Sequence, residues 1–316
     1  MKICPLCQES SAAQERVLNS FHLLRCTQCR FVYADIDDHV IERLYTNLGD
    51  GVAQVYESIQ TLLDDLWFRR IAVRFTGLMG PGKVLDIGCG NGLLLKQFKQ
   101  LGWQCYGADP CPWSKSYAER YGFVLCQQEV QYLPSDFGRF DLITSSSTLE
   151  HVAQPLSHIR AILKLLKTTG MGYFCGIPNY GSLSIRLNLS DFYMNTPPGH
   201  VNYFTSATLV RLFHSAGIPR QNMKIRTYGI PGAHAFYNKM TGLLGAGRRA
   251  VAGETQRIAG EKELMMSSLK ENILKRKLGE LLLSIYFNAG RAGGLGDKLE
   301  AVILNLHGDK HHEVDA

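Results

Sequence analysis

The stretch VLDIGCGNG at residues 84–92 constrains the fold of this chain more than any other feature. An apolar run enters it, glycines stand at the alternate positions Gly88, Gly90 and Gly92, and LLLKQFKQLG follows with helical spacing. Glycine tolerates positive φ and lets a ligand lie directly against the main chain. The stretch therefore predicts a strand, a tight turn and a helix, with a nucleotide-like ligand at the turn.

The turn lacks the marks of two common phosphate-binding loops. A dinucleotide-binding fingerprint would place its third glycine at position 93, where this chain has Leu93, and no Gly-Lys-Ser/Thr follows to complete a Walker A loop. Asp86 instead places an anion at the mouth of the turn. This arrangement favours a ligand that carries positive charge or hydrogen-bond donors.

Strands and helices alternate from residue 83 onward. Apolar runs predict strands over 83–87, 103–109, 122–126, 140–145 and 172–177, with further candidates at 224–230 and 298–306. Helical spacing predicts helices over 92–101, 113–120, 154–167 and 206–216. The alternation indicates an α/β chain built on a doubly wound, seven-stranded, mostly parallel Rossmann-like sheet.

The length of 316 residues supports one large domain with attachments. We expect five parts: a cysteine-bounded unit over 1–36, a helical linker over 37–80, a core over 81–230 plus 298–308, a helical insertion over 231–297, and a flexible tail over 309–316.

Further motifs follow the glycine turn in a fixed order. YGADP places Asp109 at the end of the second strand, FDLITSSSTLEHV (140–152) spans the fourth strand and the segment after it, and LLKTTGMGYFCGIPN (165–179) runs through a turn into the fifth strand. With D-x-G-x-G-x-G at Asp86–Gly92, this order resembles class I S-adenosylmethionine-dependent methyltransferases. The resemblance covers roughly residues 80–230 and implies that 298–306 is a seventh, antiparallel strand.

The resemblance also implies roles for the motif residues. Asp109 would bind both ribose hydroxyls of S-adenosylmethionine, Glu129 would face the adenine amino group, and Val130 would present its backbone N–H beside it. The cofactor-binding residues predicted in this way are Asp86, Gly88, Cys89, Gly90, Gly92, Asp109, Pro110, Glu129, Val130 and Ser146. The chain departs from the family in KTTG, where Pro-Gly-Gly is usual, and in the serines at 145–147, which would reshape the acceptor pocket.

Four of the nine cysteines lie within the first 29 residues. Cys4-x2-Cys7 and Cys26-x2-Cys29 have the spacing of two metal-binding knuckles, which together can close a tetrahedral thiolate shell around Zn²⁺. So small a unit has little apolar mass of its own, and a metal would supply folding energy. A disulfide pair or a redox CxxC is the alternative. A saturated site predicts a structural zinc rather than a catalytic one.

A cysteine ribbon followed by this core resembles bacterial enzymes that methylate sugars in nucleotide-activated, surface-polysaccharide or natural-product pathways. Related proteins share the Pro-Asn after the fifth strand and an H-x-x-Y-F-(S/T) segment, here His200 to Thr205. A small-molecule acceptor, which could be anionic, is therefore expected. A hydroxyl or acidic C–H nucleophile needs a base, and His151 after the fourth strand and His200 in PPGHVNYF are the two candidates.

The formal charge of +6 is local, since nine Lys/Arg and four Glu fall between positions 239 and 277. Because of this basic stretch, the alternative function is an RNA methyltransferase that binds nucleic acid through the zinc unit and the basic segment. The absence of interleaved aromatics in the stretch argues against it. MKICPLC lacks a signal-peptide pattern, so we expect a cytoplasmic protein without a transmembrane segment, for which peripheral membrane contact and oligomeric state stay open.

Overall fold

A computed structural model describes residues 2–18, 20–46, 62–134, 136–187, 197–229 and 295–304, together with Ser284 and Asn288. The predicted insertion over 231–297 lies almost entirely outside the described residues, as does the predicted tail over 309–316. No helix within the described ranges is long and apolar enough to cross a membrane.

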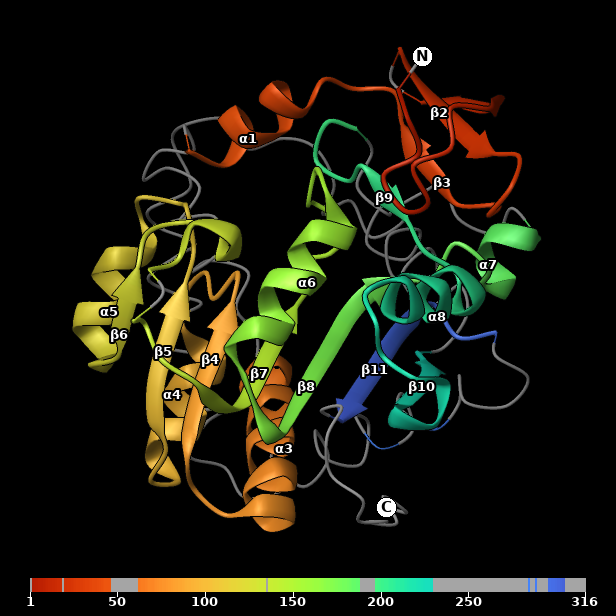
Figure 1. The fold of residues 1–316 in the computed structure, drawn as a ribbon. Coiled ribbons are helices and arrows are strands. Elements are labelled where there is room, and N and C mark those ends of the chain that lie inside the picture. Colours follow the sequence, from red (N-terminus) through yellow and green to blue (C-terminus); the bar gives the residue numbers. More distant parts are fainter. Residues whose placement is uncertain are drawn as a thin grey trace, which may run out of the picture.

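The larger sheet has seven strands in the order β10-β11-β8-β7-β4-β5-β6 (Figure 1). Its strands are β4 (Lys83–Ile87), β5 (Gln104–Ala108), β6 (Val124–Cys126), β7 (Phe140–Ser146), β8 (Leu166–Pro178), β10 (Met223–Tyr228) and β11 (Lys298–Leu304). The pairs from β8 through β7, β4 and β5 to β6 are parallel, whereas β11 runs antiparallel to both β8 and β10. The predicted doubly wound sheet and its antiparallel seventh strand are confirmed.

Helices cover both faces of this sheet. Successive side chains of a strand point to opposite faces, and accordingly Val84 packs in one apolar cluster and Leu85 in another. The first cluster includes α3 (Leu62–Met79) and α4 (Leu93–Gln100). The second includes α6 (Pro155–Leu165) and α8 (Ser206–Ser215). Two more helices are α5 (Ser114–Tyr121) and the short α7 (Leu183–Arg186).

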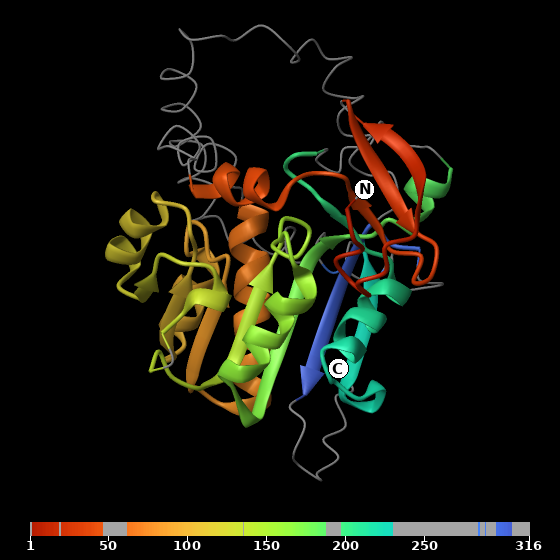
Figure 2. The same ribbon diagram turned by 45° about the horizontal axis from the view of Figure 1, so that its top comes forward.

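The N-terminal unit forms a second, four-stranded sheet in the order β1-β2-β3-β9. Its strands are β1 (Ala12–Leu18), β2 (Phe21–Cys26), β3 (Val32–Ala34) and β9 (Asn202–Tyr203). The last strand comes from the segment that follows β8 and α7, so the small sheet is completed by a part of the chain far away in sequence. Figure 2 shows this sheet beside the carboxyl edge of the large one.

The two sheets share one apolar core. Phe31 of the N-terminal unit lies 4.9 Å from Phe204, measured between ring centroids, and both rings are fully buried. Helix α1 (Asp38–Thr46) leaves the unit and passes over the carboxyl ends of the parallel strands (Figure 1). The N-terminal unit is therefore packed against the edge where α/β sheets bind their ligands.

Several predicted boundaries differ from the structure by a few residues. The fifth parallel strand was expected over 172–177, but β8 begins at Leu166, directly after α6 ends at Leu165. No glycine turn separates the two elements, because Leu166 already has extended backbone angles. Lys167 in this extension forms an ion pair with Asp141 at the start of β7, with 2.7 Å between Nζ and Oδ1.

Candidate cofactor-binding and catalytic site

The glycine turn between β4 and α4 has the backbone that its sequence predicts. Gly88, Gly90 and Gly92 have φ values of 71°, 49° and 65°, in the left-handed region that residues with a Cβ rarely adopt. A Cβ on Gly88 would come within 2.5 Å of Thr148 Oγ1. The hydroxyl of Thr148 donates to the carbonyl oxygen of Ile87 at 3.2 Å, so the turn packs against the loop that follows β7.

Two buried carboxyl groups flank this turn. Asp86 in β4 is 3% exposed and accepts a hydrogen bond of 2.7 Å from the hydroxyl of Thr144 in β7. Asp109 follows β5 and is 5% exposed. Its two oxygens accept from the backbone N–H groups of Gly90 (2.7 Å) and Cys111 (2.8 Å). Asp109 therefore ties the glycine turn to the end of β5, and each of its oxygens retains a lone pair for a ligand hydroxyl.

Burial dominates the electrostatics of these carboxyl groups. Burial raises the pKa of Asp86 to about 7, the hydrogen bond from Thr144 opposes the shift, and the charge of Asp109 adds to it. Burial also raises the pKa of Asp109, against the opposing hydrogen bonds of Cys111 and Gly90. A positively charged ligand beside Asp86 would relieve the cost of ionising it.

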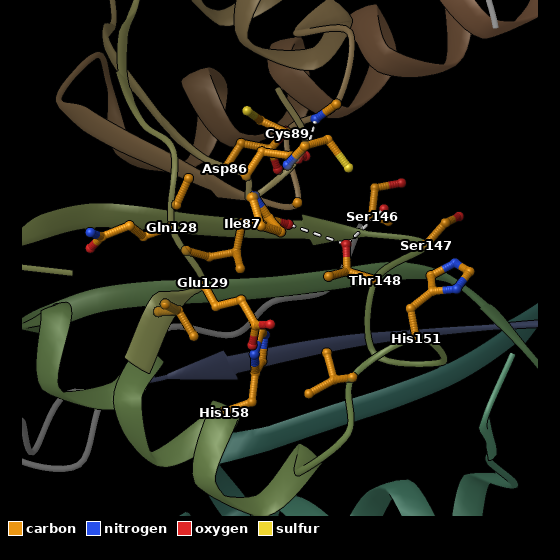
Figure 3. Close-up of a pocket in the computed structure, with 18 of the residues that line it drawn as sticks. Asp86, Ile87, Cys89, Gln128, Glu129, Ser146, Ser147, Thr148, His151 and His158 are labelled. Carbon is orange, nitrogen blue, oxygen red and sulfur yellow. Dashed lines mark hydrogen bonds between the residues drawn. The ribbon is translucent and has the colours of Figure 1, made fainter. Parts of the chain in front are cut away.

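A cavity of about 770 Å³ opens over the turn (Figure 3). Its volume lies in the range of roughly 300–1,000 Å³ that is typical of small-molecule sites. The predicted site residues that line it are Asp86, Gly88, Cys89, Gly90, Asp109, Pro110, Glu129, Val130, Ser146 and His151. Gly92 and His200 do not belong to its described lining. Gly92 instead is the N-cap residue of α4, and a Cβ there would come within 2.5 Å of the Phe123 ring.

Glu129 and Val130 lie where the β6 end of the sheet meets the cavity. Glu129 directly precedes the short 3-10 helix η1 (Val130–Tyr132), and its carboxylate accepts a hydrogen bond from the side chain of Gln131. Burial raises the pKa of Glu129, with the hydrogen bond from Gln131 opposing the shift. Val130 is buried beneath it.

Other lining residues lie outside the predicted set. Helix α1 contributes Ile41 and Glu42, α3 contributes Phe68, and α6 contributes His158. Trp113 and Thr148 also line the cavity. Thr148 lies within the motif at 140–152 and Trp113 follows YGADP by three residues, so the motifs could have brought both to attention. The α1, α3 and α6 residues belong to no motif. Only the packing of these helices over the sheet places them at the cavity.

The two candidate bases, His151 and His200, lie in contact. Their ring centroids are 4.6 Å apart and the rings meet edge to face. His151 lines the cavity, and its Nδ1 is 2.8 Å from the carbonyl oxygen of Gly199. Its Nε2 lies 4.0 Å from Oε1 of Glu150, which is 1% exposed. One ligand-type atom from each of Glu150, His151 and His200 falls within 4.8 Å of the others.

His200 lies in a drier setting than His151. It is 7% exposed, and burial, followed by the charges of His151 and Lys298, lowers its pKa to about 2. The neutral imidazole is therefore its state throughout the physiological range. Lys298, at the start of β11, is half-buried, and desolvation lowers its pKa while Glu150 and Asp297 oppose the shift.

The segment that carries His200 is held from both sides. The backbone N–H groups of Val201 and Asn202 donate to the carbonyl oxygen of Glu150 at 2.8 and 3.1 Å. The N–H of Ala34 in β3 donates to the carbonyl oxygen of Val201 at 2.9 Å. The N-terminal sheet therefore positions the His200 segment against the loop that bears His151.

The four N-terminal cysteines converge on one point. Their sulfur atoms all lie within 4.8 Å of one another, with Cys4 Sγ 3.6 Å from Cys29 Sγ and Cys7 Sγ 3.5 Å from Cys26 Sγ. These separations exceed the S–S bond of about 2.05 Å, and all four thiols are free. They are close to the S···S distance of about 3.8 Å expected between two sulfur ligands of a tetrahedral site with Zn–S bonds of about 2.3 Å.

Similarity to known proteins agrees with this fold. Residues 56–218 match the methyltransferase domain family. A SAM-dependent methyltransferase from Thermotoga maritima has a TM-score of 0.51 at 12% identity, over 84% of this chain and all of that one. The plantazolicin methyltransferase BpumL in complex with SAH has a TM-score of 0.50 at 16% identity, over 85% of this chain and 95% of that one. Such likeness concerns the fold.

Curated relatives align over the core. The ubiquinone biosynthesis O-methyltransferase of Cereibacter sphaeroides is 36% identical over 95 residues, which are 28% of this chain and 38% of that protein. Its counterpart in Haemophilus ducreyi is 34% identical over 121 residues, 35% of this chain and 51% of that protein. The chain thus matches about half or less of the length of these relatives.

The glycine turn, the flanking carboxyl groups and the seven-stranded sheet define a protein of the class I S-adenosylmethionine-dependent methyltransferase fold. With the family match spanning half of its length, the chain belongs to the methyltransferase domain family.

Proposed function

We propose that this protein transfers a methyl group from S-adenosylmethionine to a small-molecule acceptor, a sugar or a nucleotide- or lipid-linked biosynthetic intermediate. The cavity over the glycine turn carries this proposal, because it is lined by two buried carboxyl groups, the glycine turn and His151. The curated relatives are named as O-methyltransferases, which supports a hydroxyl group as the acceptor atom.

The cofactor would lie along the glycine turn. Gly88 and Gly90 leave room for it against the main chain, Asp109 would accept from the ribose hydroxyls, and Glu129 with the Val130 N–H would face the adenine. Asp86 would balance its positive charge. Cys89, Pro110 and Ser146 complete the walls, and Gly92 holds the turn without touching the ligand.

Bound S-adenosylmethionine would supply an activated methyl group on a good leaving group. The protein then has to align the acceptor and exclude water, which are effects of orientation and desolvation. Ile41 of α1 and Phe68 of α3 bring apolar surface to the cavity from outside the sheet. A dry wall of this kind suits a reaction in which charge disperses.

His151 is proposed as the general base. If its Nδ1–H donates to the Gly199 carbonyl oxygen, the neutral ring keeps a lone pair on Nε2 for the proton of the acceptor hydroxyl. The nearby carboxyl of Glu150 would stabilise the imidazolium that forms. His200, neutral and packed edge to face on His151, would position that ring rather than exchange a proton itself.

Zn²⁺ is proposed as a structural ion held by Cys4, Cys7, Cys26 and Cys29. The sulfur positions suit a tetrahedral site, and four thiolate ligands are a common set for structural zinc. The RNA alternative depends partly on the basic stretch at 239–277, which lies outside the described residues, so it stays a prediction. Cytoplasmic location and the domain bounds likewise stay predictions.

Calorimetric titration with S-adenosylhomocysteine tests the function. We expect saturable one-site binding to the wild-type protein, and mass spectrometry of ligands that co-purify would identify the acceptor. His151→Gln should retain this binding but lose about 10²–10⁴-fold in kcat, the usual contribution of a general base. His214→Gln, on the exposed face of α8, is the matched control and should leave kcat unchanged. A wild-type protein that binds no S-adenosylhomocysteine would refute the proposal.

A further inference from the structure

His158 is a polar residue of the cavity that the proposed function leaves without a role. It lies in α6, is 4% exposed, and lines the cavity (Figure 3). Within the described part of the chain, neither Nδ1 nor Nε2 has a hydrogen-bond partner. Buried polar atoms in native proteins are nearly always paired, so an exception that faces a ligand cavity needs an explanation.

Its position places it at the Glu129 end of the cavity. Helix α6 packs against η1, the short helix that Glu129 directly precedes. Figure 3 shows His158 and Glu129 pointing into the same part of the cavity, whereas His151 lies at another part, beside Ser147. His158 is therefore separated from the candidate base and belongs to the opposite portion of the site.

The chemistry of this end suits a heteroaromatic amine. Burial lowers the pKa of His158 to about 4, so its ring is neutral at physiological pH and offers one N–H donor and one acceptor nitrogen. The Glu129 carboxyl group offers acceptor oxygens. A base with an exocyclic amino group and unprotonated ring nitrogens presents the complementary groups, a donor for Glu129 and an acceptor for the imidazole N–H.

We propose that His158 is a nucleobase-binding residue, whose imidazole N–H donates to N3 or N7 of the cofactor adenine while Glu129 accepts from the amino group. The inference rests on the proposed function and extends it to a residue outside the sequence motifs. The adenine nitrogen would be a partner for the imidazole N–H, which is one of the two His158 ring positions without a hydrogen-bond partner among the described residues.

This assignment predicts opposite effects on folding and binding. A phenylalanine has a similar planar ring and no nitrogens, so His158→Phe removes the unpaired polar atoms from the unliganded protein. We expect the Tm of the unliganded variant to equal or exceed that of the wild type. The same change removes a hydrogen bond to the ligand, so the Kd for S-adenosylhomocysteine should rise about tenfold.

The test is calorimetric titration of wild-type, His158→Phe, His158→Gln and His214→Phe proteins with S-adenosylhomocysteine and its 3-deaza and 7-deaza analogues. The analogues each lack one adenine ring nitrogen. In the wild type, at least one analogue should bind about tenfold more weakly than the parent compound, and His158→Phe should abolish that difference. His158→Gln retains an amide donor and should bind with intermediate affinity, whereas His214→Phe, on exposed α8, should match the wild type.

Equal affinity of wild-type protein and His158→Phe for the parent compound and both analogues would overturn the inference while leaving the proposed function intact. If His158→Phe does not fold, the wild-type comparison of the analogues decides alone, and two analogues that bind like the parent compound reject the ring-nitrogen contact. A wild-type protein that binds none of the three compounds refutes the proposed function itself, and the inference with it.

Discussion

Gly88 illustrates how one residue couples the cofactor turn to the rest of the site. Its positive φ could be expected from the glycine spacing, but the contact with Thr148 could not, since Thr148 belongs to a different strand–helix connection. The absence of a Cβ at Gly88 therefore has two consequences. It permits the turn, and it lets the loop that precedes His151 approach the main chain.

Gly88→Ala should destabilise the protein and abolish binding of S-adenosylhomocysteine. The alanine would have to adopt the left-handed backbone conformation, which costs about 1–2 kcal/mol. Its Cβ would lie 2.5 Å from Thr148 Oγ1 and 2.8 Å from Thr148 Cγ2. We expect a loss of more than about 2 kcal/mol in the free energy of unfolding, measured in urea. Adding Thr148→Ala should recover part of it.

Gly77→Ala provides the matched control. Gly77 lies near the end of α3 with nothing within 4 Å of its hypothetical Cβ, so alanine should stabilise the helix by up to about 1 kcal/mol and leave binding unchanged. If Gly88→Ala were equally stable and bound the ligand normally, the inferred close contact between the glycine turn and the Thr148 loop would be contradicted.

At the scale of elements, β9 links the cysteine unit to the acceptor side of the cavity. The sequence predicts a separate unit over 1–36 joined to the core by a helical linker. In the structure, β3 pairs with β9, two residues beyond His200, and the same segment is bonded to the carbonyl of Glu150. The unit is thus part of the scaffold that holds the two histidines together.

Removal of the proposed zinc should loosen the His200 segment and spare the cofactor turn. A small unit that loses its metal loses much of its folding energy, and β9 would then lose its partner strand. Hydrogen exchange with mass spectrometry, before and after chelation, should show faster exchange in 21–34 and 201–204. Peptides covering β4 and the glycine turn serve as the internal control. Unchanged protection of 201–204 in the metal-stripped protein would contradict this coupling.

At the scale of the whole molecule, the buried carboxyl group of Asp86 has an electrostatic cost for the stability of the fold. Asp86 is buried at the carboxyl edge of the sheet between helices on both faces, and its pKa is about 7 in the folded protein against an ordinary value of 3.8. Between these two values the unfolded chain ionises this carboxyl while the folded chain keeps it protonated. The contribution of Asp86 therefore makes the folded state less stable as pH rises from about 4 to about 7.

Asp86→Asn should remove this pH-dependent loss. The amide oxygen can still accept from Thr144, so the variant should gain stability relative to the wild type between pH 5 and 8, by an amount that grows with pH through about 7. Urea unfolding across this range measures the effect. S-adenosylmethionine, a cation, should bind the wild type more tightly as pH rises through about 7 and bind Asp86→Asn with little pH dependence.

The exposed Glu119→Gln on α5 is the control for a surface charge change and should leave the pH profile of the wild type unaltered. An Asp86→Asn profile parallel to that of the wild type would show that Asp86 is not the group that titrates.

Local pattern determined the strand–turn–helix unit, the doubly wound sheet and the cysteine cluster, and the resemblance to class I methyltransferases indicated most residues around the cofactor turn. Each depends on interactions between near neighbours or on a side-chain periodicity that a single strand or helix expresses. The carboxyl ends of parallel strands meet at one edge, so motifs at strand ends could be placed together without coordinates.

Only the tertiary structure decided how the distant segments close the site. The contact between His151 and His200, the pairing of β3 with β9, and the arrival of Ile41, Phe68 and His158 at the cavity all join segments that no spacing relates. These contacts arise from the way helices bury their apolar faces on the sheet. That packing follows the shape of the whole core, which local sequence does not encode.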